Sequence, residues 1–190
     1  MSQKSVSELV ALSTWPAETL SAPVFPLVED ARDEWLESAA TQQDHQDHLE
    51  EIQRKTTALF EAAKDQYFED GMESAFSNEL VAFIEKHGEA AVKAITHLIT
   101  SEIVNVEVAA EALRWLGRMD HAPTHNARLR LLERSLFCSS AGVRDGAVLG
   151  LASMDDPHAI TYLEQAIQRE KHAELREDFQ QVLTQLETSE

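Results

Sequence analysis

The second half of the chain contains an internal repeat of helical sequence. Segments 107–120, 142–156 and 174–187 align without gaps, at successive offsets of 35 and 32 residues. Four of the five compared positions are apolar in all three copies, and in the first copy these four are Val108, Ala112, Leu116 and Met119. Units of this length cannot bury an apolar face alone and become stable by stacking on one another. The repeat therefore predicts a stack of helical hairpins.

A second apolar pattern lies between the repeated segments and supplies the other helix of each hairpin. Leu129, Leu132 and Leu136 correspond to Ile160, Leu163 and Ile167 at an offset of 31 residues. Segment 88–99 is a weaker counterpart ahead of the first copy, and segment 77–88 fits an earlier helix. Two boundaries carry capping signals: Asp156 before Pro157, and Ser139 and Ser140 before a helix that begins near Ala141.

Short motifs inside the repeats are similar to a known family. Residues 143–147 read V-R-D-x-A, and the pattern A-x-x-x-L-G/A precedes an acidic turn in the first two copies. Together with the spacing of 31–35 residues, these motifs resemble HEAT-like repeats over about residues 88–187. The resemblance implies an all-α fold, an α-α superhelix of HEAT-like helical hairpins. It implies no particular activity, because members of this family bind very different partners.

The front of the chain has a different pattern. Pro16, Pro23 and Pro26 predict an extended or turning N-terminal arm over residues 1–26. Apolar residues at helical intervals predict a long pair of acidic helices over residues 27–75. We expect the superhelix to occupy residues 76–190 as one continuous domain. No segment shows the two-residue alternation of a strand, so we predict no sheet.

Charge limits the partners of the chain. The net charge is −18, of which −13 falls on residues 1–90 and −5 on residues 91–190. Such a chain repels nucleic acid and anionic membranes, and a basic protein is its natural complement. The alternative is that the acidic surface only keeps the protein soluble. The uncharged stretches of the chain are too short to span a membrane, and its N-terminus lacks the apolar core of a signal peptide. The single cysteine fits a reducing compartment. We therefore expect a cytoplasmic protein.

Three glycines raise a question about the middle repeat. Gly142, Gly146 and Gly150 recur every four residues in a segment that otherwise predicts a helix, where an interior glycine costs about 1 kcal/mol relative to alanine. The stripe that connects the first two reads Gly142, Gly146, Leu149 and Ser153. We interpret it as the floor of a docking groove on the concave face. Its predicted walls are Glu107, Glu111, Arg114 and Arg118 on one side and Glu174 and Asp178 on the other.

Two alternatives to this groove remain open at the level of sequence. The glycine stripe can pack against a neighbouring helix or against the arm between Pro16 and Pro26. It can also join two copies of the chain in a homo-oligomer, since small residues four apart let two helices approach closely.

Residues that can carry chemistry are few. Asp44, His48 and Glu51 share a helix face, but no second ligand-bearing segment accompanies them, so we predict no metal site. Cys138 lacks an identifiable base, and the histidines at 121 and 125 flank a turn. No phosphate-binding glycine motif is present, and we predict no cofactor.

These observations predict a non-enzymatic interaction module, an adaptor or regulator with an acidic surface. A narrower alternative is an immunity protein or antitoxin that neutralises a basic toxin. An enzymatic alternative follows from the resemblance, since some HEAT-like proteins resemble bilin lyases and others resemble iron hydroxylases that use His-Glu pairs. No such pair lies on the three inner helices, which argues against iron.

Overall fold

The computed structural model describes residues 29–69 and 71–188, and all the regular structure in them is helical. The chain divides into two units, Met1–Ala40 and Thr41–Glu190. The arm predicted over residues 1–26 lies outside the described residues. The described residues form eight α-helices, which confirms the all-α prediction: α1 (Glu29–Ala62), α2 (Ala75–His87), α3 (Glu89–Thr100), α4 (Val106–Arg118), α5 (His125–Ser135), α6 (Ala141–Met154), α7 (Ile160–Arg169) and α8 (Ala173–Thr188).

A single helix takes the place of the pair expected over residues 27–75. Helix α1 runs from Glu29 to Ala62, and no glycine or proline interrupts it. Both residue types end or weaken helices, so their absence lets one helix continue. Near its C-terminal end Phe60 is buried, and its ring meets the Phe76 ring of α2 edge to face, with centroids 5.3 Å apart.

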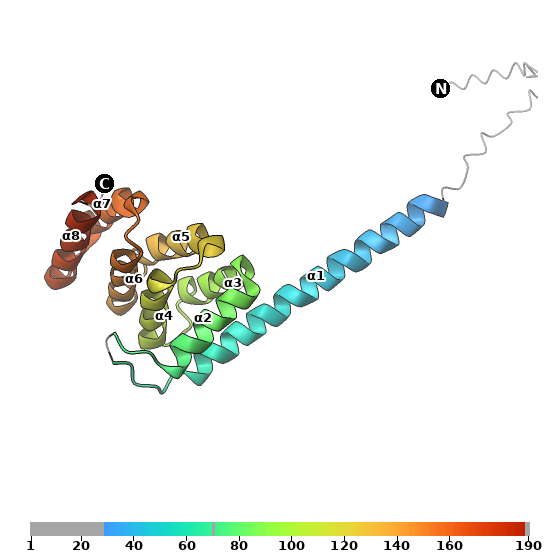
Figure 1. Cartoon of the computed structure of the whole chain (residues 1–190), viewed down its shortest axis with the longest axis horizontal. Coiled ribbons are helices and arrows are strands. Elements are labelled where there is room, and N and C mark those ends of the chain that lie inside the picture. Colours follow the sequence, from blue (N-terminus) through green and yellow to red (C-terminus); the bar gives the residue numbers. More distant parts are fainter. Residues whose placement is uncertain (1–28, 70, 189–190) are drawn as a thin grey trace, which may run out of the picture. The chain divides into compact units, whose positions relative to one another are not determined.

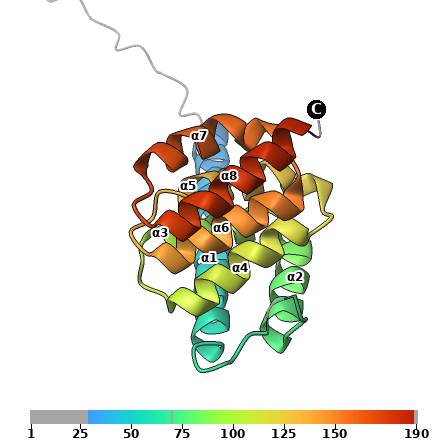
Figure 2. The same cartoon turned by 90° about the vertical axis from the view of Figure 1, so that its left-hand side faces the viewer.

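The helices after residue 74 pack as hairpins in two layers (Figure 1). Helix α2 packs against α3, α4 against α5, α5 against α6, and α7 against α8. The inner layer consists of α2, α4, α6 and α8, in which each helix packs against the next. The outer layer contains α3, α5 and α7. Figure 2 shows α4, α6 and α8 side by side.

The repeated apolar positions form the core, as the sequence predicts. In the first two copies Val108, Leu116, Val143 and Leu151 are buried, together with the alanines at 112 and 147. Leu175 and Phe179 occupy the corresponding places on α8 and are buried as well. Burial of each large side chain stabilises the fold by about 1.5–3 kcal/mol. Since these side chains lie between neighbouring repeats, each repeat depends on the next for its stability.

Helices begin at both predicted boundaries, but only Asp156 makes a capping hydrogen bond. Ser140 is the residue that precedes α6, which begins at Ala141, although its side chain makes no capping hydrogen bond. Asp156 accepts a hydrogen bond from the backbone N–H of His158 at 2.9 Å and caps the short 3₁₀ turn Pro157–Ala159 that leads into α7. Within the described residues, none of the helices has the length and apolar character needed to cross a membrane.

The glycines of α6 face α4 rather than an open groove. A Cβ atom on Gly146 would lie 2.5 Å from the Cα atom of Ala110, and one on Gly150 would lie 2.5 Å from the carbonyl oxygen of Leu113. Gly117 of α4 meets the backbone of Gly150 in the same way. The two helices therefore touch through their backbones. Any side chain at these points would push them apart.

This contact corrects two expectations. Gly146 is buried in the interface between α4 and α6, so it is not the floor of a docking groove. Gly146 and Gly150 are both buried against α4, so these two glycines do not contact a second copy of the chain. The alternative, that the stripe packs against a neighbouring helix, is the one the structure shows for these two glycines.

Candidate partner-binding surface

A pocket of about 350 Å³ lies between α4, α6 and α8. The three helices run in the same direction because α5 returns the chain between α4 and α6, and α7 returns it between α6 and α8. Their N-terminal parts therefore lie at one edge of the inner layer. We call this the inner pocket. It is lined by Glu107, Ala110, Arg114, Ala141, Gly142, Asp145, His172, Glu174, Leu175 and Asp178.

Carboxylates dominate the inner pocket. Glu107, Asp145, Glu174 and Asp178 line it, against one guanidinium and one imidazole. Glu107 and Glu174 lie in the first turns of α4 and α8. Negative charge is favourable there because the backbone N–H groups at a helix N-terminus are unpaired and partly positive. The fold thus stabilises an acidic pocket at this edge.

The guanidinium of the pocket is already neutralised. Arg114 Nη1 donates to Glu111 Oε2 at 3.1 Å, and Arg114 Nη2 lies 3.4 Å from Asp145 Oδ2. The first of these bonds joins residues one helical turn apart, and the second joins α4 to α6. Arg114 therefore compensates carboxylates beside it, and the remaining carboxylates give the inner pocket a negative surface.

Five of the ten residues predicted for the groove line the inner pocket: Glu107, Arg114, Gly142, Glu174 and Asp178. Gly142 is half-buried and faces Val106 of α4, where a Cβ would lie 2.7 Å from Val106 Cγ1. Glu174 is exposed, and Asp178 is half-buried. The two sides of the predicted groove are therefore brought together, across a floor narrower than expected.

The other predicted residues lie elsewhere. Glu111 is buried and accepts a hydrogen bond from Trp115 Nε1 at 2.6 Å, so it points into the protein. Arg118 is exposed and lies over the Trp115 ring, 5.2 Å from its centroid. Leu149 and Ser153 are exposed on α6 beyond the pocket. With Gly146, these positions do not contribute to the inner pocket.

Sequence reasoning missed five lining residues: Ala110, Ala141, Asp145, His172 and Leu175. A signal for two of them was present. Ala110 and Asp145 correspond at the repeat offset of 35, and each follows a predicted residue by three positions. The prediction stepped four residues on from Glu107 and Gly142, to Glu111 and Gly146, whereas the residues that line the pocket lie three residues on, at Ala110 and Asp145. Residues three and four apart share a helix face, and only the neighbouring helix decides between them.

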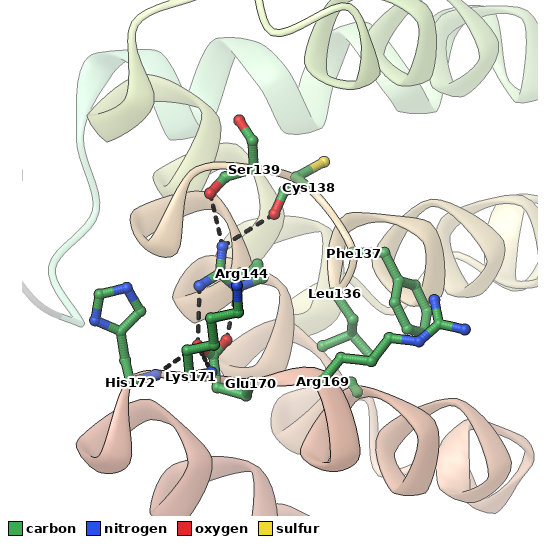
Figure 3. Close-up of a pocket in the computed structure, with 10 residues that line it drawn as sticks. Leu136, Phe137, Cys138, Ser139, Arg144, Arg169, Glu170, Lys171 and His172 are labelled. Atoms are coloured by element: carbon green, nitrogen blue, oxygen red, sulfur yellow. Dashed lines mark hydrogen bonds and ion pairs between the residues drawn. The ribbon is translucent and has the colours of Figure 1, made fainter.

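A bidentate ion pair fixes the segment that leads into α8 (Figure 3). Arg144 Nε lies 2.6 Å from Glu170 Oε2, and Arg144 Nη2 lies 3.0 Å from Glu170 Oε1. Arg144 Nη1 also donates to the carbonyl oxygens of Cys138 and Ser139. Glu170 accepts from the backbone N–H groups of the next two residues at 2.8 and 2.9 Å. One arginine thereby ties the α5–α6 loop to the start of α8.

This network stabilises the ionised form of Glu170. Its side chain is 2% exposed, and the hydrogen bonds from Arg144 hold the pKa of the carboxyl at about 2. A second cavity of about 340 Å³ lies beside the ion pair. Arg144 and Glu170 bind each other, so their polar groups are not free to bind a ligand in this cavity. We therefore interpret the ion pair as structural support for the neighbouring inner pocket.

The remaining candidates for chemistry do not assemble into a site. Among residues 41–69 and 71–188, no three metal-binding side chains come together. Glu51 pairs with Arg54 and Lys55, and His48 lies near the ring of His87. Cys138 is half-buried, and burial raises the pKa of its thiol. A raised pKa suppresses the nucleophilic thiolate.

Comparison with known proteins identifies the repeats. The family model for HEAT repeats matches residues 93–184, which include α4 to α7 and most of α3 and α8. No curated protein and no solved structure matches the chain.

Proposed function

Because residues 93–184 are HEAT repeats, we propose that the protein is a non-enzymatic interaction scaffold whose inner pocket holds a basic segment of a partner protein. HEAT repeat domains are typically protein–protein interaction scaffolds. Stacked helical repeats present their inner helices to partners along a continuous face. The inner pocket lies on that layer, between three successive inner helices.

The observation that carries this proposal is the unequal charge of the inner pocket. Four carboxylates line it, and its arginine is occupied by Glu111 and Asp145. A lysine or arginine side chain that enters would meet Glu107, Glu174 and Asp178. The hydrocarbon stem of such a side chain could cover Ala110 and Leu175, which provide an apolar surface beside the charges.

The charge of the whole chain supports the same partner. At a net charge of −18, long-range attraction would accelerate association with a basic protein. The inner pocket would then be the place where a basic side chain of that partner binds. An adaptor or regulator that recognises basic segments fits both observations.

A peptide titration tests the proposal. A short fluorescein-labelled peptide that alternates lysine with leucine is titrated with the full chain, and its fluorescence anisotropy is measured. Asp178→Asn removes one pocket carboxylate, and Glu177→Gln removes an exposed carboxylate next to it that does not line the pocket. Both changes alter the net charge equally, so they separate local recognition from general attraction.

We expect Asp178→Asn to weaken binding about threefold to fivefold, as for a partly exposed ion pair, while Glu177→Gln leaves it close to wild type. The double variant Glu174→Gln/Asp178→Asn should weaken binding about tenfold. Equal affinities for all variants would place the basic segment elsewhere and overturn the proposal. A matching peptide with glutamine in place of lysine should not bind.

A further inference from the structure

A further hollow lies on the outer layer, and its charged side chains are mainly positive, in contrast to those of the inner pocket. It measures about 500 Å³ and lies between α3 and α5. Val92 and Leu131 are buried at its base, and Thr96, His97, Thr100, Asn126 and Ala127 complete its lining. Its rims carry Lys93, Arg130 and Arg134, opposed by Glu89. We call this hollow the outer groove.

The cations of the outer groove differ from most others in the repeats. Elsewhere, Arg144 pairs with Glu170, Arg118 lies over Trp115, and Arg169 lies over Phe137. Within the described residues, the side chains of Lys93, Arg130 and Arg134 form no ion pair, hydrogen bond or aromatic contact. Arg130 has only a longer-range attraction to Glu133 of the same helix. Three cations that form no ion pair around one groove are unexpected in a chain with a net charge of −18.

Stabilisation of the helices explains the position of only one of these three cations. Arg134 lies in the last turn of α5, where positive charge is favourable. Lys93 and Arg130 lie in the middle of α3 and α5, where the helix dipole gives no such benefit. Arg130 and Arg134 are also one turn apart on the same face, and like charges at this spacing destabilise a helix. A negatively charged occupant would remove that repulsion.

We infer that the outer groove binds an acidic peptide segment of a partner protein. Lys93 on α3 and Arg130 and Arg134 on α5 would meet carboxylates from both sides. Ala127, a partly buried apolar residue of the lining, would contact an apolar side chain between them. The net charge of the chain opposes nucleic acid as the occupant, because the rest of the surface would repel a long polyanion. Repulsion between two chains of −18 likewise opposes a second copy.

The inference does not depend on the inner pocket, since the two hollows share no lining residue. Together they would let one chain contact a basic and an acidic segment at the same time, on its two layers.

A fluorescein-labelled peptide that alternates glutamate with leucine tests the assignment by anisotropy, with the full chain. Lys93→Gln/Arg130→Gln removes the two cations that helix stability does not explain. Lys171→Gln is the matched control for loss of an exposed cation outside the groove. We expect the double variant to bind about tenfold more weakly than wild type and Lys171→Gln to bind as wild type does. Higher salt should weaken wild-type binding.

Three results would overturn the inference. Equal affinity of the double variant and wild type would exclude the groove as the acidic peptide's site. A short single-stranded DNA that binds through the same two cations more tightly than the peptide would assign the groove to nucleic acid. A dimer in light scattering that the double variant loses would assign it to a second copy. Circular dichroism of each variant confirms that the helices are intact.

Discussion

Gly146 of α6 lies against the backbone of Ala110 in α4, so closely that a Cβ atom on the glycine would be 2.5 Å from the Ala110 Cα atom. No real Cβ approaches another residue's backbone to this distance, and backbone atoms cannot turn aside as a flexible side chain can. The glycine therefore sets the separation of the two central helices of the repeat. That separation also places Glu107 and Arg114 near Asp145 at the inner pocket.

We expect Gly146→Ala to destabilise the protein, although alanine is the better helix former. The gain in helix propensity is about 1 kcal/mol, whereas overpacking costs about 1–3 kcal/mol and here forces two backbones apart. The free energy of unfolding, from urea denaturation followed by circular dichroism, should fall. Ser153→Ala, at an exposed position of the same helix, should change it by less than about 0.5 kcal/mol. A more stable Gly146→Ala variant would contradict the close contact.

Arg128 supports the turn between α4 and α5 from inside the protein. It is 1% exposed and donates to the carbonyl oxygens of Leu116 and His121 and to Thr124 Oγ1. Arg128→Leu leaves these acceptors buried without their donor, so we expect a loss of about 2–4 kcal/mol in the free energy of unfolding. Arg130→Gln, two residues away and exposed, is the stability control and should stay within about 0.5 kcal/mol of wild type. Comparable losses for both variants would argue against a specific role of the buried guanidinium.

The Arg144–Glu170 pair makes stability depend on pH in the acidic range. Glu170 has a pKa of about 2 in the folded protein, below its ordinary value of 4.5, so its contribution is complete above about pH 5 and is lost as the pH falls towards 2. The full shift corresponds to about 3 kcal/mol. Glu170→Gln should therefore be less stable than wild type at neutral pH, and the difference should shrink on acidification. Urea denaturation across this pH range measures it, with Glu177→Gln as the control. A difference that stays constant with pH would show that the ionised carboxylate is not the stabilising form.

Cys138 should react slowly with alkylating reagents. Burial raises the pKa of its thiol, and the nearby carboxylate of Glu102 raises it further. Since only the thiolate reacts, we expect alkylation by iodoacetamide at neutral pH to be at least about tenfold slower in the folded chain than in urea. The chain has one cysteine, so the gain in mass reports on Cys138 alone. Equal rates in both conditions would indicate an accessible thiolate.

Much of the fold could be predicted because it depends on local periodicity. The repeated apolar positions, including Val108, Val143 and Leu175, identify the buried face of each inner helix without knowledge of its neighbours. The length of α1 was harder to predict. Its apolar stripe begins only where the helix meets the hairpins, and the polar sequence before it carries no signal for where one helix ends and another begins.

The candidate site could be predicted only in part. Helical spacing groups Glu107 with both Ala110 and Glu111, yet Ala110 faces the inner pocket and Glu111 is buried against Trp115. The choice depends on the rotation of α4 about its own axis, which is set by its packing on α6. The outer groove escaped sequence analysis for a similar reason, because Lys93 and Arg130 come from different hairpins.

The sequence by itself determined the helices of the repeats, their order and the apolar face that each inner helix buries. It did so because apolar residues recur with a period of 3.6 residues and the units recur at intervals of 31–35 residues. Only the tertiary structure decided what each remaining face does. Gly146 suits both an open groove and a helix interface, and the distance to Ala110 selects the interface. That distance arises from the stacking of two repeats, which is a property of three-dimensional packing and not of local sequence.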